Sequence, residues 1–130
     1  MERKKFLKGD LICRENTPGE TMYVILSGKV RVFITMNAEK IELNILGSGN
    51  FCGEMCLLLK GERTASMEAL EDTVVQILNK ESLLKKIQED RQFALRMITT
   101  MAKRLKDAHG VISRLEGAKK SLEIMYGYKL

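Results

Sequence analysis

Up to about residue 78, short apolar runs alternate with residues that favour turns. Each run has the length of a β-strand, and several alternate apolar and polar positions as a half-buried strand does. The predicted strands cover residues 11–13, 22–26, 30–35, 41–46, 66–70 and 73–78. Many short strands at regular spacing are typical of an antiparallel sandwich or barrel.

From Asn79 onward the apolar positions follow the period of a helix. Asn79 is a suitable N-cap for a short helix, and Asp90 begins a longer helix predicted over 91–116. Gly110 marks the expected point of a kink or a frayed turn. No structure is predicted for the tail, 117–130.

The long helix carries an apolar stripe at alternating spacings of four and three residues. Its members are Met101, Leu105, Ala108, Ile112 and Leu115. A heptad stripe of this kind requires a partner surface, which is either the same chain or a second helix. Self-association through the long helix is the favoured interpretation, so we expect a homodimer.

The composition fits one folded domain. The chain has 130 residues, of which 45% are hydrophobic. We expect 1–90 to hold the strands and the short helix, 91–116 the long helix, and 117–130 a tail. No apolar run approaches the roughly 18 residues of a membrane span, and no apolar stretch follows the basic start as in a signal peptide. A cytoplasmic location with no membrane partner is therefore expected.

Cysteine and histidine are too sparse for the common metal sites. The three cysteines, Cys13, Cys52 and Cys56, form no C-x-x-C pair, and His109 is the single histidine. Reduced thiols fit this pattern better than a disulfide framework or a zinc site. We expect no bound metal and no catalytic residues.

The positive charge is concentrated in the second part of the chain. Residues 1–78 hold ten Lys and Arg against eleven Asp and Glu, whereas residues 79–130 hold twelve against six. A basic helix can bind nucleic acid, but it more often forms a solvated face, and the second interpretation is favoured.

Residues 49–66 combine the groups that an anion site needs. Gly53 permits a sharp turn, and the following residues can begin a helix whose N–H groups favour a phosphate. Arg63 adds a guanidinium fork that suits two phosphate oxygens, and Thr64 adds a hydroxyl. Glu54 is best explained as an acceptor for a sugar hydroxyl. Sugar and phosphate together indicate a nucleotide.

This segment resembles the phosphate-binding cassette of the cyclic nucleotide-binding domain. The residues that carry the resemblance are Gly53-Glu54-Met55-Cys56-Leu57-Leu58 and Arg63-Thr64-Ala65-Ser66. Residues 8–12 and 19–30 resemble the first strands of that domain, and 101–105 resemble the dimerisation helix of the bacterial catabolite activator relatives. The resemblance covers residues 6–115.

The resemblance implies an eight-stranded antiparallel jelly-roll barrel with a cassette helix and two C-terminal helices. Cyclic AMP or cyclic GMP would be the ligand, and no further cofactor is implied. Glu54 would accept from the ribose 2′-OH, and Arg63 would pair with the cyclic phosphate. The full set of implied ligand-binding residues is Gly53, Glu54, Met55, Cys56, Arg63, Thr64, Ala65, Val32, Leu43, Asn44, Phe51 and His109.

The choice between the two nucleotides stays open. The positions that contact the base in the catabolite activator relatives fall at Ala108 and His109, where those relatives present two hydroxyl residues. Ala108 offers no hydrogen bond and His109 offers an imidazole, so the pattern of the relatives does not carry over.

The resulting hypothesis is a sensor module in which a bound cyclic nucleotide rearranges the C-terminal helices and an unknown effector protein responds. The relatives continue into a helix-turn-helix that has no counterpart here, so no direct DNA binding is expected. One alternative is a degenerate barrel that acts as a protein-interaction scaffold. An enzyme that hydrolyses cyclic nucleotides is disfavoured because no metal cluster or positioned histidine accompanies the cassette.

Overall fold

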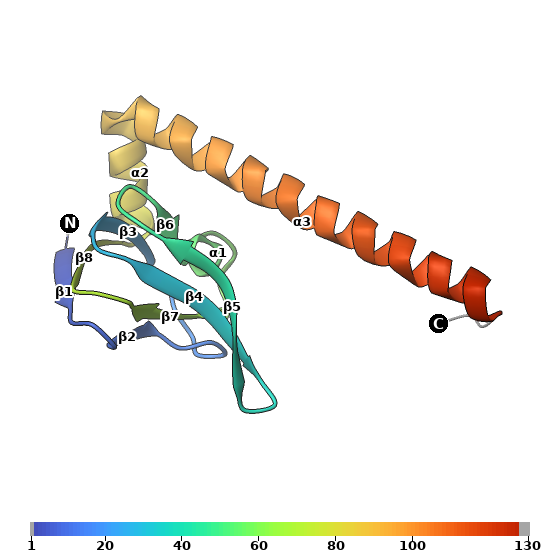
Figure 1. The fold of residues 1–130 in the computed structure, drawn as a ribbon. Coiled ribbons are helices and arrows are strands. Elements are labelled where there is room, and N and C mark those ends of the chain that lie inside the picture. Colours follow the sequence, from blue (N-terminus) through green and yellow to red (C-terminus); the bar gives the residue numbers. More distant parts are fainter. Residues whose placement is uncertain (1, 128–130) are drawn as a thin grey trace. The chain divides into compact units, whose positions relative to one another are not determined.

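A computed structural model describes residues 2–127 of the chain (Figure 1). Eight strands come first, with one short helix among them, and two helices follow. The elements are β1 (Glu2–Phe6), β2 (Leu11–Cys13), β3 (Met22–Ser27), β4 (Val30–Met36), β5 (Glu39–Leu46), β6 (Phe51–Cys52), α1 (Glu54–Leu59), β7 (Ser66–Ala69), β8 (Thr73–Leu78), α2 (Lys80–Glu89) and α3 (Arg91–Tyr126).

The strands form two antiparallel four-stranded sheets. The first has the order β1-β8-β3-β6 and the second the order β2-β7-β4-β5. The predicted fold class, mainly β with C-terminal helices, is confirmed. The strands within residues 2–127 are divided between two sheets rather than joined in one closed ring, an arrangement compatible with a jelly roll.

The core lies between the two sheets. Its central cluster takes side chains from both of them, and Ile25, Val30 and Val75 have no exposed surface. The cluster consists of Phe6, Tyr23, Ile25, Val30, Leu46, Cys52, Met67, Ala69 and Val75. Since burying one large apolar side chain contributes about 1.5–3 kcal/mol, this cluster supplies the main force that joins the sheets.

Two strands were not predicted from the sequence. β1 is mostly charged and exposed, and it exists because it pairs with β8 over its whole length. β6 is only two residues long and is defined by its pairing with β3. Both strands depend on a distant partner, so neither shows the alternation that identifies a strand locally.

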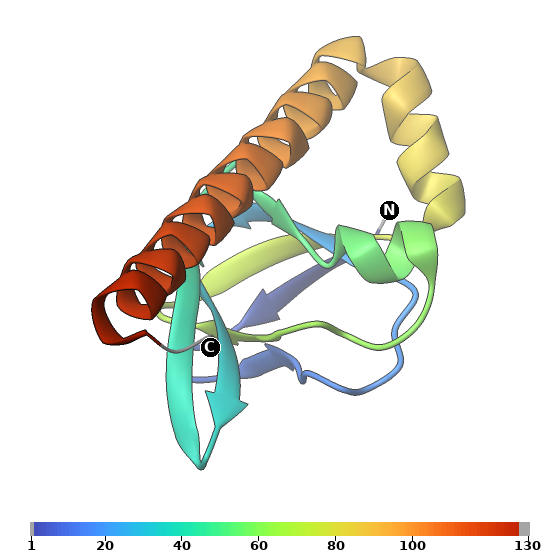
Figure 2. The ribbon, with the colours of Figure 1, turned by 90° about the vertical axis from the view of Figure 1, so that its right-hand side faces the viewer.

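The β4–β5 hairpin turns at Asn37 and Ala38, which have φ values of 51° and 64°. Positive φ at both central residues is the geometry of a type I′ turn. Figure 2 shows the two strands continuing side by side to this turn. β5 begins at Glu39, two residues earlier than predicted, because the tight turn lets pairing start at once.

The predicted N-cap of the short helix is confirmed. The Asn79 side chain accepts from Ser82 N at 2.8 Å, and Ser82 Oγ accepts from Asn79 N at 2.8 Å. Together the two bonds satisfy donors at the start of α2. In α2, Leu83 is buried, whereas the next residue, Leu84, is 53% exposed.

α3 begins where predicted but continues past 116 to Tyr126. The Asp90 side chain accepts from Phe93 N at 3.0 Å, and Gly127, in the left-handed region, closes the helix with a bond to Glu123 O. Gly110 and Gly117 are both helical. The expected break at Gly110 is therefore absent, because one glycine costs only about 1 kcal/mol within a long helix.

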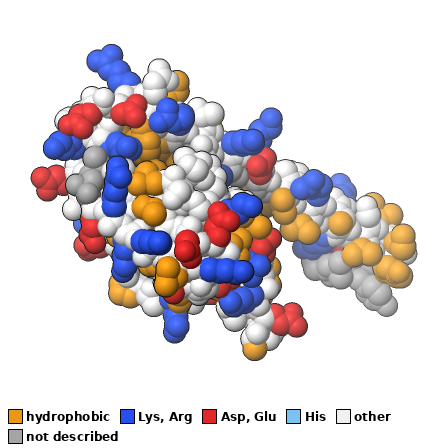
Figure 3. Space-filling view, turned by 60° about the vertical axis from the view of Figure 1, so that its left-hand side comes forward, with side chains coloured by type: hydrophobic (Ala, Val, Ile, Leu, Met, Phe, Trp, Pro, Cys, Tyr) orange, Lys and Arg blue, Asp and Glu red, His pale blue; other side chains and the backbone are white. Residues whose placement is uncertain are grey.

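The chain divides into two compact units, one up to Glu89 and one from Asp90 onward. On the face of the first unit shown in Figure 3, Lys and Arg are interspersed with Asp and Glu. Within residues 2–127 no helix combines the length and the hydropathy required to cross a membrane.

The hairpin turn generates a prediction about stability. An L-residue in the left-handed region costs about 1–2 kcal/mol, and glycine avoids that cost but loses about 0.5–1 kcal/mol of backbone entropy. Replacing Ala38→Gly should therefore raise the free energy of unfolding by about 0.5–1 kcal/mol, measured by urea denaturation. The control Ala69→Gly, in the buried part of β7, should lower it. A loss of stability in Ala38→Gly would contradict the type I′ assignment.

Candidate functional site

The predicted cassette forms a tight turn and one short helix between β6 and β7. Gly53 is the N-cap of α1, with φ of 82°, a conformation that L-residues rarely adopt. Having no side chain, it places no capping group over the first N–H groups of α1. The expected helical turn after Gly53 is present and extends to Leu59.

The backbone of Arg63 is fastened to the loop between β2 and β3. Arg63 N donates to Thr17 O at 2.8 Å, and Asn16 N donates to Arg63 O at 2.8 Å. An isolated β-bridge joins Pro18 to Glu62. Residues 16–18, more than forty positions earlier in the sequence, thus hold the end of the cassette through backbone contacts.

The Arg63 side chain is buried, with 5% of its surface exposed. Nη1 donates to Thr21 O at 2.5 Å and to Gly53 O at 3.4 Å. Nη2 donates to Thr21 Oγ1 at 3.0 Å and to the Tyr23 hydroxyl at 3.3 Å. These acceptors are all neutral, so the hydrogen bonds satisfy the guanidinium without cancelling its charge.

Two glycines lie against the guanidinium. A Cβ added to Gly19 would come within 2.6 Å of Arg63 Cζ, and one added to Gly53 would come within 2.8 Å of Nη1. Neither distance is compatible with a real side chain, so both positions require glycine while Arg63 keeps this conformation. The sequence predicts the turn at Gly53 and its place in the cassette, but not the contact of either glycine with Arg63.

The other cassette residues differ in exposure. Glu54 is half-buried and Met55 is exposed at the start of α1, whereas Cys56 is buried. After Arg63, Thr64 is exposed and Ala65 is buried. The structure thus brings Gly53 and Arg63 into direct contact and places Glu54, Met55 and Cys56 on the helix that starts beside them.

Val32, Leu43, Asn44 and Phe51, four of the implied ligand-binding residues, would form the wall of the pocket, and a bulge in β5 decides how the first three are paired. Val32 pairs with Asn44, but the next pair is Phe33 with Glu42, so Leu43 is an extra residue in β5. Val32 and Asn44 lie two positions from the buried pair Val30 and Leu46, and therefore belong to the inner face of the sheet.

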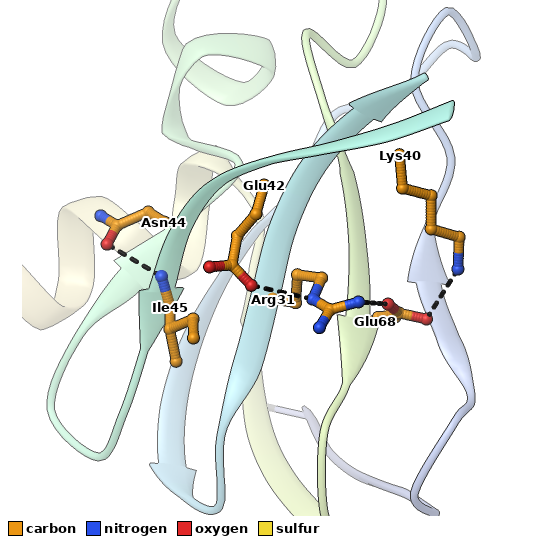
Figure 4. A network of polar contacts seen from close by, with 6 residues as sticks. All are labelled: Arg31, Lys40, Glu42, Asn44, Ile45 and Glu68. Carbon is orange, nitrogen blue, oxygen red and sulfur yellow. Dashed lines mark hydrogen bonds and ion pairs between the residues drawn. The ribbon is translucent and has the colours of Figure 1, made fainter. Parts of the chain in front are cut away.

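The remaining wall residues are arranged less uniformly. Asn44 is exposed, and its Oδ1 accepts from Ile45 N at 2.9 Å (Figure 4). Leu43 is 55% exposed, whereas Phe51 on β6 is 4% exposed. His109 is exposed on α3, in the second unit, and its contact with a base stays a prediction.

The outer face of the same sheet is occupied by ion pairs. Arg31 Nε lies 3.0 Å from Glu42, and Arg31 Nη1 lies 3.2 Å from Glu68 (Figure 4). Lys40 Nζ reaches the other oxygen of Glu68 at 3.3 Å. Arg31 is therefore paired with carboxylates, in contrast to the neutral hydrogen-bond acceptors around Arg63.

Thr21 and Tyr23 are the residues that sequence reasoning missed. Tyr23 lies in the predicted strand 22–26 and Thr21 directly precedes it, and neither is predicted to take part in the site. Their contact with Arg63 spans about forty positions and follows from the pairing of β3 within the fold. No local pattern distinguishes them from other strand residues.

No cluster of three or more His, Cys, Asp or Glu side chains suited to a metal ion occurs among the residues that the structure describes. The polar groups assembled around Arg63 are an amide backbone, hydroxyls and a single guanidinium. This chemistry suits recognition of an anion by hydrogen bonds and charge.

Residues 3–90 match the profile of a family described as "Cyclic nucleotide-binding domain". The Cyclic AMP receptor protein of Thermus thermophilus is 36% identical over 108 residues, spanning 82% of this chain and 50% of that protein. The crystal structure of the Thermus thermophilus catabolite activator protein is similar with a TM-score of 0.79 and 34% identity, over 88% of this chain and 55% of that chain. The chain thus spans about half the length of these relatives.

The EAL enzyme Bd1971 is a third similar protein. Its cyclic AMP-bound form gives a TM-score of 0.62 and 29% identity, over 94% of this chain and 33% of that chain. Its cyclic GMP-bound form gives a TM-score of 0.62 and 32% identity, over 80% and 28%. The similarity includes a protein whose solved forms contain either nucleotide.

Cys13, next to this site, generates a prediction about pH. Its thiol lies 3.9 Å from Ala65 O. Burial raises the pKa of the Cys13 thiol from its ordinary 9.0 to about 11, although the nearby charge of Arg63 opposes the rise. Between these values the unfolded chain has lost this proton and the folded chain keeps it. The free energy of unfolding should fall as pH rises through this window, by up to about 1.4 kcal/mol per pH unit from this group.

Urea denaturation of the wild type and of Cys13→Ser at pH 8 and pH 10.5 isolates this contribution. Other groups that titrate in this range affect both proteins alike. The stability of the wild type relative to Cys13→Ser should therefore decrease at the higher pH. A constant difference would show that the thiol titrates alike in both states.

Proposed function

Because the chain belongs to the cyclic nucleotide-binding domain family, we propose that it binds cyclic AMP or cyclic GMP as a sensor module whose helices respond to the ligand and signal to a partner protein. The observation that carries the proposal is the buried Arg63 guanidinium at the start of the cassette helix, hydrogen-bonded to neutral groups. A buried charge of this kind attracts an anion strongly, because no solvent screens it.

In the proposed complex, the Arg63 guanidinium binds the cyclic phosphate, which replaces Gly53 O, the acceptor of its longest present hydrogen bond at 3.4 Å. Glu54 accepts from the ribose 2′-OH, and the backbone N–H groups near Gly53, Cys56, Thr64 and Ala65 complete the phosphate cradle. The remaining contacts come from the walls and the long helix. They are made by Met55, Val32, Leu43, Asn44, Phe51 and His109.

The proposed role is regulatory rather than catalytic. In this proposal the guanidinium, the hydroxyls and the backbone donors bind the phosphate diester, and the Glu54 carboxylate accepts from the ribose. Binding acts by favouring one arrangement of the C-terminal helices over another. A partner protein would recognise one of these arrangements, so its binding to the chain would depend on the cyclic nucleotide.

Arg63→Ala tests the ligand assignment. Losing a charge-assisted fork to the phosphate should weaken binding of both nucleotides by at least about a hundredfold, measured by isothermal titration calorimetry. Arg63→Lys keeps the charge without the fork, so its affinity should lie between those of the wild type and Arg63→Ala. The matched control is Arg31→Ala, which removes an arginine from the outer face of the second sheet and should leave affinity unchanged.

Circular dichroism of each variant confirms that the sheets are folded. Saturable binding of one nucleotide per wild-type chain, lost in Arg63→Ala, supports the proposal and identifies the preferred base. Equal affinity in Arg63→Ala and the wild type would contradict the role of Arg63. The absence of heat with both nucleotides in the wild type would contradict the proposed function.

We further propose that α3 mediates a homodimer. Beyond 116 the same register reaches Lys119, Leu122 and Tyr126, so the apolar stripe resumes at Leu122 after one charged position. Leu105, Ile112 and Leu115 are 70%, 54% and 65% exposed in a single chain, and orange side chains are visible along α3 in Figure 3. The two helix glycines lie on the face opposite this stripe, where they do not interrupt it.

The combined variant Leu105→Asp and Ile112→Asp should be a monomer, because a dimer would bury two charges in the stripe of each helix. Size-exclusion chromatography with light scattering measures the mass. The control variant combines Lys106→Asp and Ser113→Asp. It introduces two aspartates directly after Leu105 and Ile112, outside the stripe, and should keep the mass of the wild type. An unchanged dimer in the first variant would exclude this interface.

A further inference from the structure

We propose that Thr21 and Tyr23, both outside the cassette, are positioning residues that hold the guanidinium of Arg63 ready for the phosphate. This inference rests on the proposed function and extends the proposed site to the start of β3. Tyr23 belongs to β3, and Thr21 immediately precedes that strand. Neither residue is assigned a contact with the nucleotide.

The contacts fix the guanidinium in both position and plane. Thr21 accepts one hydrogen bond with its backbone oxygen, at 2.5 Å from Nη1, and one with its hydroxyl, at 3.0 Å from Nη2. The Tyr23 hydroxyl accepts a second bond from Nη2, at 3.3 Å. Since two acceptors on one residue hold both η nitrogens, rotation of the guanidinium breaks at least one bond.

The ring of Tyr23 adds a second restraint. Arg63 Cζ lies 5.2 Å from the ring centroid, within the range of an attractive cation–π contact. Gly19 and Gly53 lie so close that a Cβ at either would overlap the guanidinium, which limits its movement toward them. The side chain thus has one available conformation, and the rotamer entropy that a free arginine would lose on binding is lost before the ligand arrives.

Neutral partners are suited to this task. A carboxylate in the place of Thr21 or Tyr23 would also hold the guanidinium, but it would cancel the charge that attracts the phosphate. Hydroxyl and carbonyl oxygens orient the N–H groups and leave the net charge in place. Elsewhere in this chain an arginine with a structural role, Arg31, is paired with two carboxylates.

The same hydrogen bonds could instead compete with the phosphate for Arg63, and the two cases predict opposite signs. If Thr21 and Tyr23 position Arg63, removing either hydroxyl weakens binding. If they compete with the ligand, removing either hydroxyl strengthens binding. The sign of the change in affinity therefore decides between the two roles.

The experiment measures cyclic AMP and cyclic GMP binding to Thr21→Val and Tyr23→Phe by isothermal titration calorimetry. Each variant removes a hydroxyl that accepts from a charged donor, and we expect affinity to fall about tenfold or more. Thr21→Ser keeps a hydroxyl at this position, so its affinity for both nucleotides should equal that of the wild type. Thr35→Val, at an exposed threonine of β4, is the matched control and should have no effect.

A second readout separates positioning from general damage to the pocket. Adenosine has the base and sugar of cyclic AMP but no phosphate, so its affinity does not depend on Arg63. In competition titrations, the preference for cyclic AMP over adenosine should shrink in Thr21→Val and Tyr23→Phe, whereas damage to the pocket would weaken both ligands in parallel. If Thr21→Val is unfolded by circular dichroism, Tyr23→Phe, which keeps the buried ring, carries the test.

The outcomes distinguish this inference from the proposed function. A wild type that binds neither nucleotide contradicts both. A wild type that binds, together with variants of equal or higher affinity, overturns the positioning role and leaves the proposed function in place. Weaker binding, rescue by Thr21→Ser and a reduced preference for the phosphate-bearing ligand together establish it.

Discussion

The burial of one positive charge, the guanidinium of Arg63, is the constraint on which the site depends. A charge with 5% of its side chain exposed loses most of its hydration, so every N–H group that it turns inward needs an acceptor. The acceptors come from β3, from the residue before it and from the start of the cassette helix. The cassette is therefore completed by a strand that lies far from it in the sequence.

Much of the local structure follows from satisfying this group. While the guanidinium keeps this position, Gly19 and Gly53 have no room for side chains. The loop between β2 and β3 bonds to the backbone of Arg63 on both sides. That loop is in turn fixed by the two sheets, which join through the apolar cluster around Ile25 and Val75. The core thus holds in place the two sheets, to which both the β2–β3 loop and the segment that carries Arg63 are connected.

The sequence was sufficient to predict the fold class, the helical turn after Gly53 and the caps at Asn79 and Asp90, because strand and helix patterns, turns and caps depend on neighbouring residues. Predictions failed where distant pairing decides the structure. β1 is a strand through its pairing with β8, and the bulge at Leu43 selects Asn44 as the partner of Val32. The sequence also gave no indication of the contact between Thr21 and Arg63, since a threonine before a strand has no distinguishing pattern.

An arginine that is already in place before the ligand binds can contribute to affinity without contributing to a conformational switch. A ligand shifts a conformational equilibrium only by the difference between its affinities for the two states. An Arg63 that is held alike in both states raises both affinities equally, so it contributes to binding but not to switching. In the proposed sensor, the contacts that discriminate between the states must then come from groups that move. The half-buried Glu54 on the short helix α1 and the exposed residues of α3 are less enclosed than the guanidinium, so the proposal assigns this discrimination to them.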